Sequence, residues 1–203
     1  HLTPSQIKLE STYYKDLLYQ WLIYEKTIRP RFSVIEYEKK YKIKIGRMTF
    51  NVKIDRIDQY EDGSRLLIDY KTGAKKPISQ WKIGPTSLQM PIYVTYAGIK
   101  DISAAGIGYV HNNDVKLMGL SSYSQNPIDG ELKDCSSSKK DEDQWQYLVN
   151  FWRTTMSDLA SKFLSGDAKM VFEKDSDLEN CTVKPLLRIA ESIWLFEKEK
   201  NDE

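Results

Sequence analysis

The chain has few of the residues from which disulfide frameworks and His/Cys metal sites are built. Its 203 residues include only two cysteines, Cys135 and Cys181, and two histidines. Two cysteines make neither a disulfide framework nor a complete set of metal ligands. The sequence also lacks a signal peptide and any apolar run long enough to span a bilayer. We therefore expect a soluble, intracellular protein that does not enter a membrane.

The chain also lacks an excess of charge of either sign. Thirty Lys and Arg residues stand against 29 Asp and Glu residues, which gives a net charge of +1. This balance excludes a protein that binds polyanions through its overall field, so any nucleic-acid contact has to come from local basic patches. A chain of this length suits one domain. We expect a single domain over residues 1–203 with its core at about 32–120.

One strand pair brings charged residues together. Leu66, Leu67 and Ile68 form an apolar run typical of a buried strand, and Asp69 and Lys71 follow it. Side chains alternate along a strand, so Asp69 and Lys71 point to the same side. Residues 50–57 alternate between apolar and polar types, and the turn at 60–64 folds the next strand back beside them. This hairpin predicts that Asp55, Asp69 and Lys71 converge.

These three residues suit a particular chemistry. Charges at the end of a buried strand are costly unless they are paired or bind a metal. Two carboxylates with a nearby backbone carbonyl make an oxygen site suited to Mg²⁺ or Mn²⁺. A lysine beside such a metal can orient or deprotonate an attacking water. We therefore interpret Asp55, Asp69 and Lys71 as a candidate hydrolytic site.

The same residues resemble a known family. Residues 54–58 read Ile-Asp-Arg-Ile-Asp, residues 69–73 read Asp-Tyr-Lys-Thr-Gly, and residues 88–93 contain a Gln-x-x-x-Tyr pattern. These three motifs, in this order, are similar to those of the PD-(D/E)XK nucleases in their RecB-type form. The resemblance implies an α/β restriction-endonuclease-like fold, a central mixed β-sheet flanked by α-helices, and metal-dependent hydrolysis of DNA.

The resemblance also assigns roles to residues. It implies that Asp55, Asp69 and the backbone carbonyl of Tyr70 hold Mg²⁺ or Mn²⁺, that Lys71 acts on the water, and that the pair Gln89 and Tyr93 lines the active cleft. An auxiliary acid of the family best matches Glu38, with Glu36 nearby. A solvated acid on a strand is an equally good interpretation of Glu38. Without the resemblance, Tyr93 is a buried tyrosine with a polar partner.

Candidate DNA contacts are less specific. Lys75 and Lys76 lie in a basic loop just after the proposed site, where lysines can contact phosphates without reading sequence. Arg56 can contact phosphate or pair with Asp58. Trp81 follows the basic loop, and we favour packing on the sheet over a position at the rim of the site.

The remaining segments predict helices around this core. Helical spacing predicts helices over 5–28, capped by Thr3 or Ser5 and ended by Arg29 and Pro30, and over 87–99. The first of these is interpreted as a helix that covers the core. A second hairpin is expected at 104–120 and a polar loop at 121–143. C-terminal helices are expected within 143–200.

The lead-in to the first strand resembles one group of this family. Trp21, Glu25, Arg29 and Phe32 are similar to a pattern in AddB-like proteins described as probable DNA repair proteins of proteobacteria. This resemblance implies an exonuclease module, a fragment of a longer protein, that acts on DNA in repair or recombination with a helicase or helicase-like partner. It also implies a bacterial, cytoplasmic, nucleoid-associated location. A stand-alone RecB-like nuclease, as in CRISPR adaptation, fits this lead-in less well.

Two departures from the family leave an alternative. Many relatives hold an iron–sulfur cluster through four cysteines. Here Cys181 stands alone near the C-terminus and Lys184 occupies the place of a second cysteine, so no cluster is expected. A histidine motif that relatives carry upstream is also missing. The alternative is a catalytically silent RecB-like module that binds DNA or a partner within a helicase–nuclease complex.

Overall fold

The computed structural model describes residues 3–73, 78–83, 87–111, 114–122, 132–134 and 144–167. The chain separates into two compact units, His1–Leu164 and Ser165–Glu203. The description below concerns the first unit, together with the last turn of the helix that ends it. Lys75, Lys76, both cysteines and the predicted terminal helix lie outside the described residues. None of the helices in the described part is both long and apolar enough to cross a membrane.

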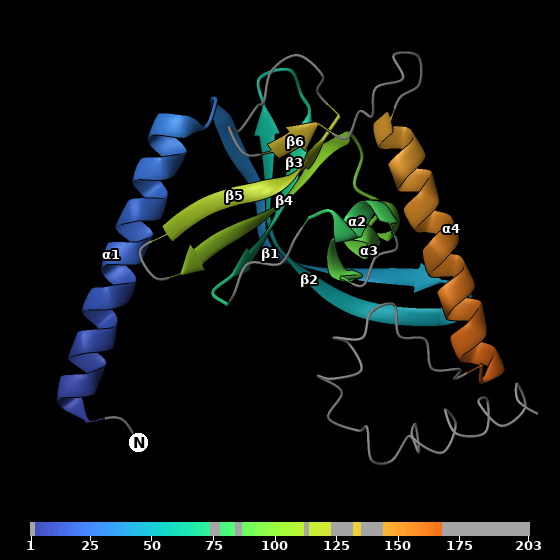
Figure 1. Ribbon diagram of the computed structural model, residues 1–203, viewed down its shortest axis with the longest axis horizontal. Helices are drawn as coiled ribbons and strands as arrows, with labels where there is room; N and C mark the ends of the chain where they lie inside the picture. The colour runs from blue at the N-terminus through green and yellow to red at the C-terminus, as the bar shows by residue number, and fades with distance from the viewer. Residues whose placement is uncertain are drawn as a thin grey trace, which may run out of the picture. The chain divides into compact units, whose positions relative to one another are not determined.

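The centre of the fold is a mixed β-sheet whose strands are ordered as they occur in the chain. All neighbouring strands pair antiparallel except β3 with β4 and β5 with β6, which pair parallel. The parallel β3–β4 pair requires a crossover, and the helices α2 and α3 provide it (Figure 1). The strands are β1 (Phe32–Ile45), β2 (Met48–Tyr60), β3 (Arg65–Lys71), β4 (Ile102–His111), β5 (Asp114–Ser121) and β6 (Leu132–Asp134).

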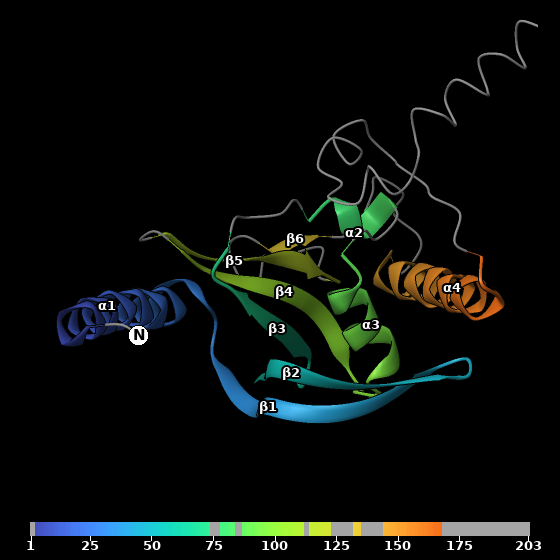
Figure 2. The ribbon, with the colours of Figure 1, turned by 90° about the horizontal axis from the view of Figure 1, so that it is seen from below.

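Helices cover both faces of this sheet, as the sequence predicted for an α/β protein. In Figures 1 and 2, α1 lies on one side of the sheet while α3 and α4 lie on the other. Two buried apolar clusters correspond to these two interfaces, one including Trp21 of α1 and one including Tyr93 of α3 and Trp152 of α4. The helices are α1 (Pro4–Ile28), α2 (Gln80–Ile83), α3 (Gln89–Tyr96) and α4 (Gln144–Ser165).

The first helix begins and ends where the sequence indicated. The Thr3 side chain accepts from the backbone of Gln6, and Gln6 reaches back to the Thr3 backbone, which completes a capping box. The helix ends before Pro30, because Arg29 preceding it is extended. The expectation that this helix covers the core holds only for its middle, where Leu17 and Trp21 are buried. Most of its other apolar side chains are exposed, among them Ile7, Leu9, Tyr13, Tyr14, Leu18, Tyr19, Leu22, Ile23 and Ile28.

In the β1–β2 hairpin, β2 runs from Met48 to Tyr60 and is therefore longer than the strand predicted at 50–57. The hairpin turn lies at Gly46 and Arg47. Near that turn, Ile45 packs with Met156 and Ala160 of α4. The far end of the hairpin is thus held by the C-terminal helix of the described chain.

One expectation was wrong. Residues 121–143 were predicted to form a loop, but β6 forms a short strand parallel to β5 within it. Leu132 is buried, and its approach depends on glycines in β4 and β5. A Cβ on Gly119 would lie 2.8 Å from Cδ2 of Leu132, and one on Gly106 would lie 3.4 Å from the same atom. A single apolar residue in a polar segment gives too weak a periodic signal to predict a strand.

Candidate active site

The end of β3 brings an acid and a base together. Asp69 is buried, with 2% of its surface exposed, and Lys71 two residues further on is exposed. The Lys71 ammonium Nζ lies 2.7 Å from Oδ2 of Asp69. The predicted alternation of the strand therefore holds, and the two charged groups share one side of β3.

Asp55 reaches the same place from β2. In the antiparallel register Arg56 pairs with Ile68, which sets Asp55 beside Asp69. Oδ2 of Asp55 accepts the backbone N–H of Tyr70 at 2.8 Å. This bond fastens the end of β3 to β2 just beyond the regular ladder, and so fixes the peptide between Asp69 and Tyr70.

Two residues of α3 complete the cluster. Gln89 Nε2 donates to Oδ1 of Asp69 at 2.7 Å, and Gln89 Oε1 accepts from Nζ of Lys71 at 2.9 Å. The same Nε2 lies 3.0 Å from the hydroxyl of Tyr93, one helical turn later. The Tyr93 hydroxyl in turn donates to the backbone carbonyl of Lys53 at 3.2 Å. One amide thus bridges the acid and the ammonium, and a tyrosine fixes that amide to β2.

Glu38 is linked to this cluster through Lys53. It has φ of 48°, a left-handed conformation that is strained for a residue other than glycine. Its carboxylate forms an ion pair with Lys53, and this bond, reinforced by the charge of Asp55, raises the pKa of Lys53. Glu36, the other candidate acid, instead binds Lys39 and Tyr41.

Lys53 is the member of this site that the sequence did not reveal. It stands in a strand of alternating polar and apolar residues, where a lysine is usually solvated. Its side chain pairs with Glu38 and its carbonyl accepts from Tyr93. No sequence signal marks such a link, because it depends on the register between β1 and β2.

Burial controls the protonation of Asp69. Removal from water raises the pKa of Asp69, and the neighbouring charge of Asp55 acts in the same direction, while Lys71 opposes both. Oδ2 of Asp69 is buried and accepts no hydrogen bond from the residues that the structure describes. The ammonium of Lys71 is its ion-pair partner, 2.7 Å away. This oxygen therefore has coordination capacity left for a cation.

The donor set fits a hard divalent cation. Within the described ranges no group of three or more His, Cys, Asp or Glu residues is arranged to hold a metal. The available donors are the carboxylates of Asp55 and Asp69 and the backbone carbonyl of Tyr70. Mg²⁺ typically binds proteins through one or two carboxylates and leaves its other positions to water and substrate phosphates. The oxygen set present here meets that requirement.

Arg56 does not face this cluster. Its guanidinium bonds to Asp58 at 2.7 and 3.0 Å, to the hydroxyl of Tyr70 at 2.9 Å, and pairs with Glu25 at 2.8 Å. Of the two roles that the sequence left open for Arg56, the structure shows the pair with Asp58. The phosphate contact stays a prediction, and in the structure the guanidinium is held by these three partners within the protein.

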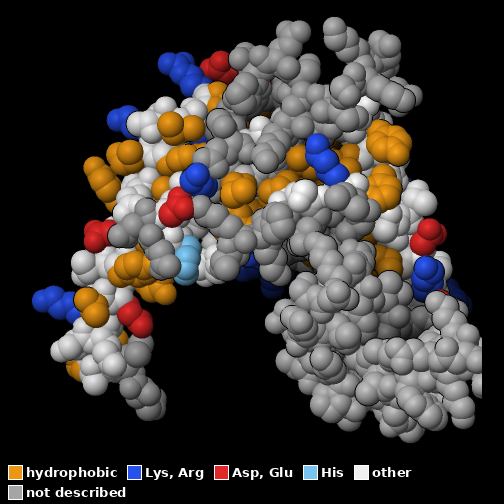
Figure 3. All heavy atoms as spheres, in the orientation of Figure 1, with side chains coloured by type: hydrophobic (Ala, Val, Ile, Leu, Met, Phe, Trp, Pro, Cys, Tyr) orange, Lys and Arg blue, Asp and Glu red, His pale blue; other side chains and the backbone are white. Residues whose placement is uncertain are grey.

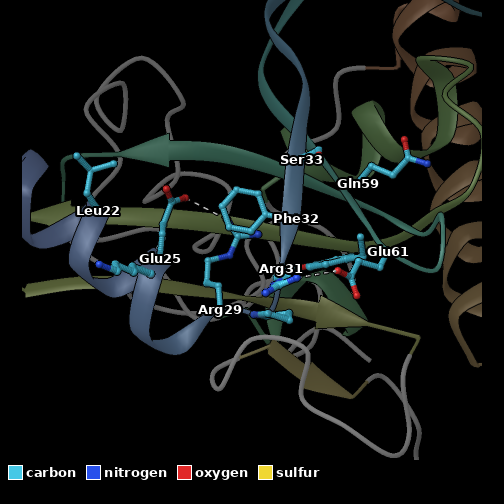
Figure 4. Close-up of a pocket in the computed structure, with 11 residues that line it drawn as sticks. Leu22, Glu25, Arg29, Arg31, Phe32, Ser33, Gln59 and Glu61 are labelled. Atoms are coloured by element: carbon cyan, nitrogen blue, oxygen red, sulfur yellow. Dashed lines mark hydrogen bonds and ion pairs between the residues drawn. The ribbon is translucent and has the colours of Figure 1, made fainter.

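Arg29, at the end of α1, is a second buried cation and shares the partners Asp58 and Glu25 with Arg56. Arg29 lies 2.8 Å from Oδ2 of Asp58 and 3.0 Å from Glu25, and its guanidinium stacks 4.0 Å from the centre of the Phe32 ring. Figure 4 shows Glu25, Arg29 and Phe32 beside a cavity of about 650 Å³ at this junction. The network ties α1 to β2, and through Arg56 to the Tyr70 side chain on β3.

Trp81 of α2 takes the structural role that we favoured. Its side chain is buried, and its backbone carbonyl accepts from Nε1 of Trp152 at 2.7 Å. The two indole rings meet edge to face at 6.4 Å. The tryptophan therefore joins α2 to α4 and is not at the rim of the site.

One comparison with known proteins identifies the family of this chain. The profile described as "PD-(D/E)XK nuclease superfamily" matches residues 8–185. The chain belongs to the PD-(D/E)XK nuclease superfamily, and the predicted restriction-endonuclease-like α/β fold is confirmed. Among solved structures, "Crystal structure of SSO0001" is 15% identical with a TM-score of 0.39, over 88% of this chain and 71% of that one. This likeness adds nothing to the family assignment. No curated protein matches the chain.

Proposed function

We propose that the chain is a Mg²⁺-dependent deoxyribonuclease that hydrolyses DNA phosphodiester bonds at Asp55, Asp69 and Lys71. The observation that carries this proposal is the meeting of two carboxylates and an ammonium at the end of β3, where Gln89 binds Asp69 and Lys71 and the Tyr70 backbone N–H binds Asp55. When bound, Mg²⁺ or Mn²⁺ supplies Lewis-acid stabilisation of phosphate charge and lowers the pKa of a bound water.

The protein's own groups have distinct tasks in this proposal. Asp55 and Asp69 bind the cation, with the Tyr70 carbonyl beside them. Lys71 presents a positive charge and hydrogen-bond donors where the scissile phosphate and the attacking water meet. Gln89 orients both Asp69 and Lys71, because its amide contacts each of them. Glu38 is proposed as an auxiliary acid that reaches the site when Lys53 releases it.

The cellular role is proposed on a narrower basis. The lead-in pattern of Trp21, Glu25, Arg29 and Phe32 supports an AddB-like exonuclease module acting in DNA repair beside a helicase. In the structure, Glu25 and Phe32 both contact Arg29, at the junction of α1 with the sheet. The pattern is thus also explained by packing, so its support for the repair role comes from the resemblance alone.

Cleavage assays test the enzyme directly. Linear single-stranded DNA, linear duplex and a covalently closed circle are incubated with Mg²⁺ or Mn²⁺ and either wild type or Lys71→Ala. We expect linear DNA to be degraded, the circle to survive, and the variant to lose about a hundredfold or more in rate. Lys162→Ala, an exposed lysine on α4, is the control and should cleave like wild type.

Metal binding distinguishes the nuclease from the silent module. Titration with Mn²⁺ should show binding that disappears in Asp55→Ala. Cleavage that survives in Lys71→Ala would refute the assigned site, and cleavage of the circle would refute the exonuclease assignment. Binding of DNA without cleavage by wild type, together with absent Mn²⁺ binding, would establish the silent module instead.

A further inference from the structure

A second cavity lies between α1 and the sheet, and nothing in the proposed chemistry uses it. Its volume is about 780 Å³, within the range of about 300–1,000 Å³ typical of ligand sites. Residues of α1, β2, β3 and β4 line it. Aromatic rings make up much of its wall: Tyr13, Tyr14, Trp21 and Tyr70.

The inner wall of this cavity is fixed. Trp21 and Tyr70 pack edge to face with ring centres 5.3 Å apart. Gly108 of β4 makes room for both rings, because a Cβ there would lie 2.7 Å from the Tyr70 ring and 3.1 Å from Trp21. The Tyr70 hydroxyl is held by Arg56 at 2.9 Å. A ligand would therefore meet preorganised aromatic surfaces.

The outer wall is exposed to solvent. Tyr13 and Tyr14 are 40% and 53% exposed, and their rings meet edge to face at 5.5 Å. Leu18 and Leu22, one and two turns further along α1, are also exposed and line the same cavity. Figure 3 shows hydrophobic side chains gathered over α1. Large apolar groups left open to water on a cavity wall are typical of a binding surface.

Polar groups also line this otherwise apolar cavity. Arg56 and Glu25 lie in its wall as an ion pair with each other at 2.8 Å, and Thr72 and His111 add a hydroxyl and an imidazole. A nucleobase has two apolar faces and an edge of donors and acceptors. Aromatic walls suit its faces, and this mixture of polar groups suits its edge.

The cavity adjoins the proposed active site through a single strand. Asp69 and Lys71 of β3 face the carboxylate cluster, whereas Tyr70 and Thr72 line the cavity. Tyr70 takes part in both, because its ring forms the cavity wall and its backbone N–H binds Asp55. The cavity therefore lies on the opposite face of β3 from the carboxylate cluster, and a DNA strand cut beside Lys71 would reach it over the exposed end of β3 at Thr72.

We infer that this cavity binds a nucleobase of single-stranded DNA next to the cleavage site, which rests on the proposed nuclease function. Stacking on aromatic side chains is tolerant of sequence, so the cavity would accept any base. A base within a duplex is already stacked, and extruding it from the duplex costs free energy. The cavity therefore favours a single-stranded segment or a frayed end over an intact duplex.

This inference is tested by changing the DNA ligand and the protein separately and measuring affinity in each combination. A labelled oligothymidylate and an abasic strand of the same length, which has the phosphates but no bases, are titrated in EDTA, where no cleavage occurs. Wild type should bind the base-containing strand about fivefold or more tightly than the abasic one. Tyr14→Ala should lose that difference while its affinity for the abasic strand stays unchanged.

Tyr19→Ala is the matched control, since Tyr19 is an exposed tyrosine of α1 that does not line the cavity. Alanine favours helix, so both variants should stay folded, which circular dichroism checks. Equal binding of the two strands by wild type, or an equal loss in Tyr19→Ala, would overturn the inference. Cleavage of linear DNA is measured separately, so failure here is distinguishable from failure of the nuclease proposal.

Two further experiments identify what occupies the cavity. Thymidine monophosphate should compete only weakly with the oligothymidylate if the base belongs to a strand, and competition as strong as that of the strand would assign the cavity to free nucleotides. Sedimentation of wild type and Tyr14→Ala tests whether a second copy fills the cavity instead. Self-association that is lost in the variant would overturn the inference.

Discussion

Replacing Arg29 by methionine should destabilise the fold markedly. The Arg29 side chain is fully buried and so is that of Asp58, which lies 2.8 Å away. Removing one partner of a buried ion pair costs about 3–5 kcal/mol, because the other charge stays buried without full compensation. Here Arg56 still binds both oxygens of Asp58, so we expect the lower end, about 3 kcal/mol.

This magnitude is measurable. For a chain of about 200 residues, 3 kcal/mol corresponds to a fall of about 6–12 °C in Tm. Urea unfolding followed by circular dichroism and by tryptophan fluorescence gives the free energy, provided the two transitions coincide. Methionine is chosen because it fills much of the arginine volume without a charge, which separates the ionic contribution from a packing defect.

The matched control is Arg31→Met. Arg31 is 90% exposed and lies 3.9 Å from Glu61, so its loss should change the unfolding free energy by less than about 0.5 kcal/mol. A result for Arg29→Met within about 0.5 kcal/mol of wild type would refute the reasoning, as would an equal loss in the two variants.

Two further predictions concern the site and the sheet. Because burial raises the pKa of Asp69 above its unfolded value, stability is lost as pH rises from the unfolded pKa to the folded one. Asp69→Asn should therefore melt at a higher temperature than wild type at pH 7, with the difference shrinking as pH falls towards about 4, and the absence of any pH trend would contradict this. Gly119→Ala should lose about 3 kcal/mol or fail to fold, because its Cβ would lie 2.1 Å from the carbonyl oxygen of Ala105. Gly73→Ala, where a Cβ meets nothing within 4 Å, should melt like wild type, and equal melting of both variants would contradict the argument.

The arrangement of the acidic cluster was predictable because it depends on local periodicity. The two-residue period of a strand puts Asp69 and Lys71 on one side, and a hairpin turn fixes the register that brings Asp55 beside them. The four-residue spacing of Gln89 and Tyr93 likewise predicts a shared helix face. The structure brings all five together. Their catalytic roles remain predictions, because convergence alone measures no reaction.

Features that depend on long-range packing could not be predicted in this way. One partner of Arg56, Glu25, comes from α1 and is brought to β2 only by the fold. The strand at Leu132 exists because two glycines on other strands leave room for it. Periodicity also gave α1 a covering role, yet most of its apolar residues are exposed. Periodicity identifies the apolar face of a helix. It does not show how much of that face the sheet covers.

The order of the strands bears on how the protein assembles during synthesis. Each described strand hydrogen-bonds to the strand described before it in the chain, so the sheet can grow from its N-terminal edge as the ribosome delivers each segment. Short connections close at low entropic cost, which favours early pairing of β2 with β3. Asp55 and Asp69 can therefore face each other before α3 packs onto the sheet. A nascent chain would carry this acidic pair without its amide partner until α3 packs onto the sheet.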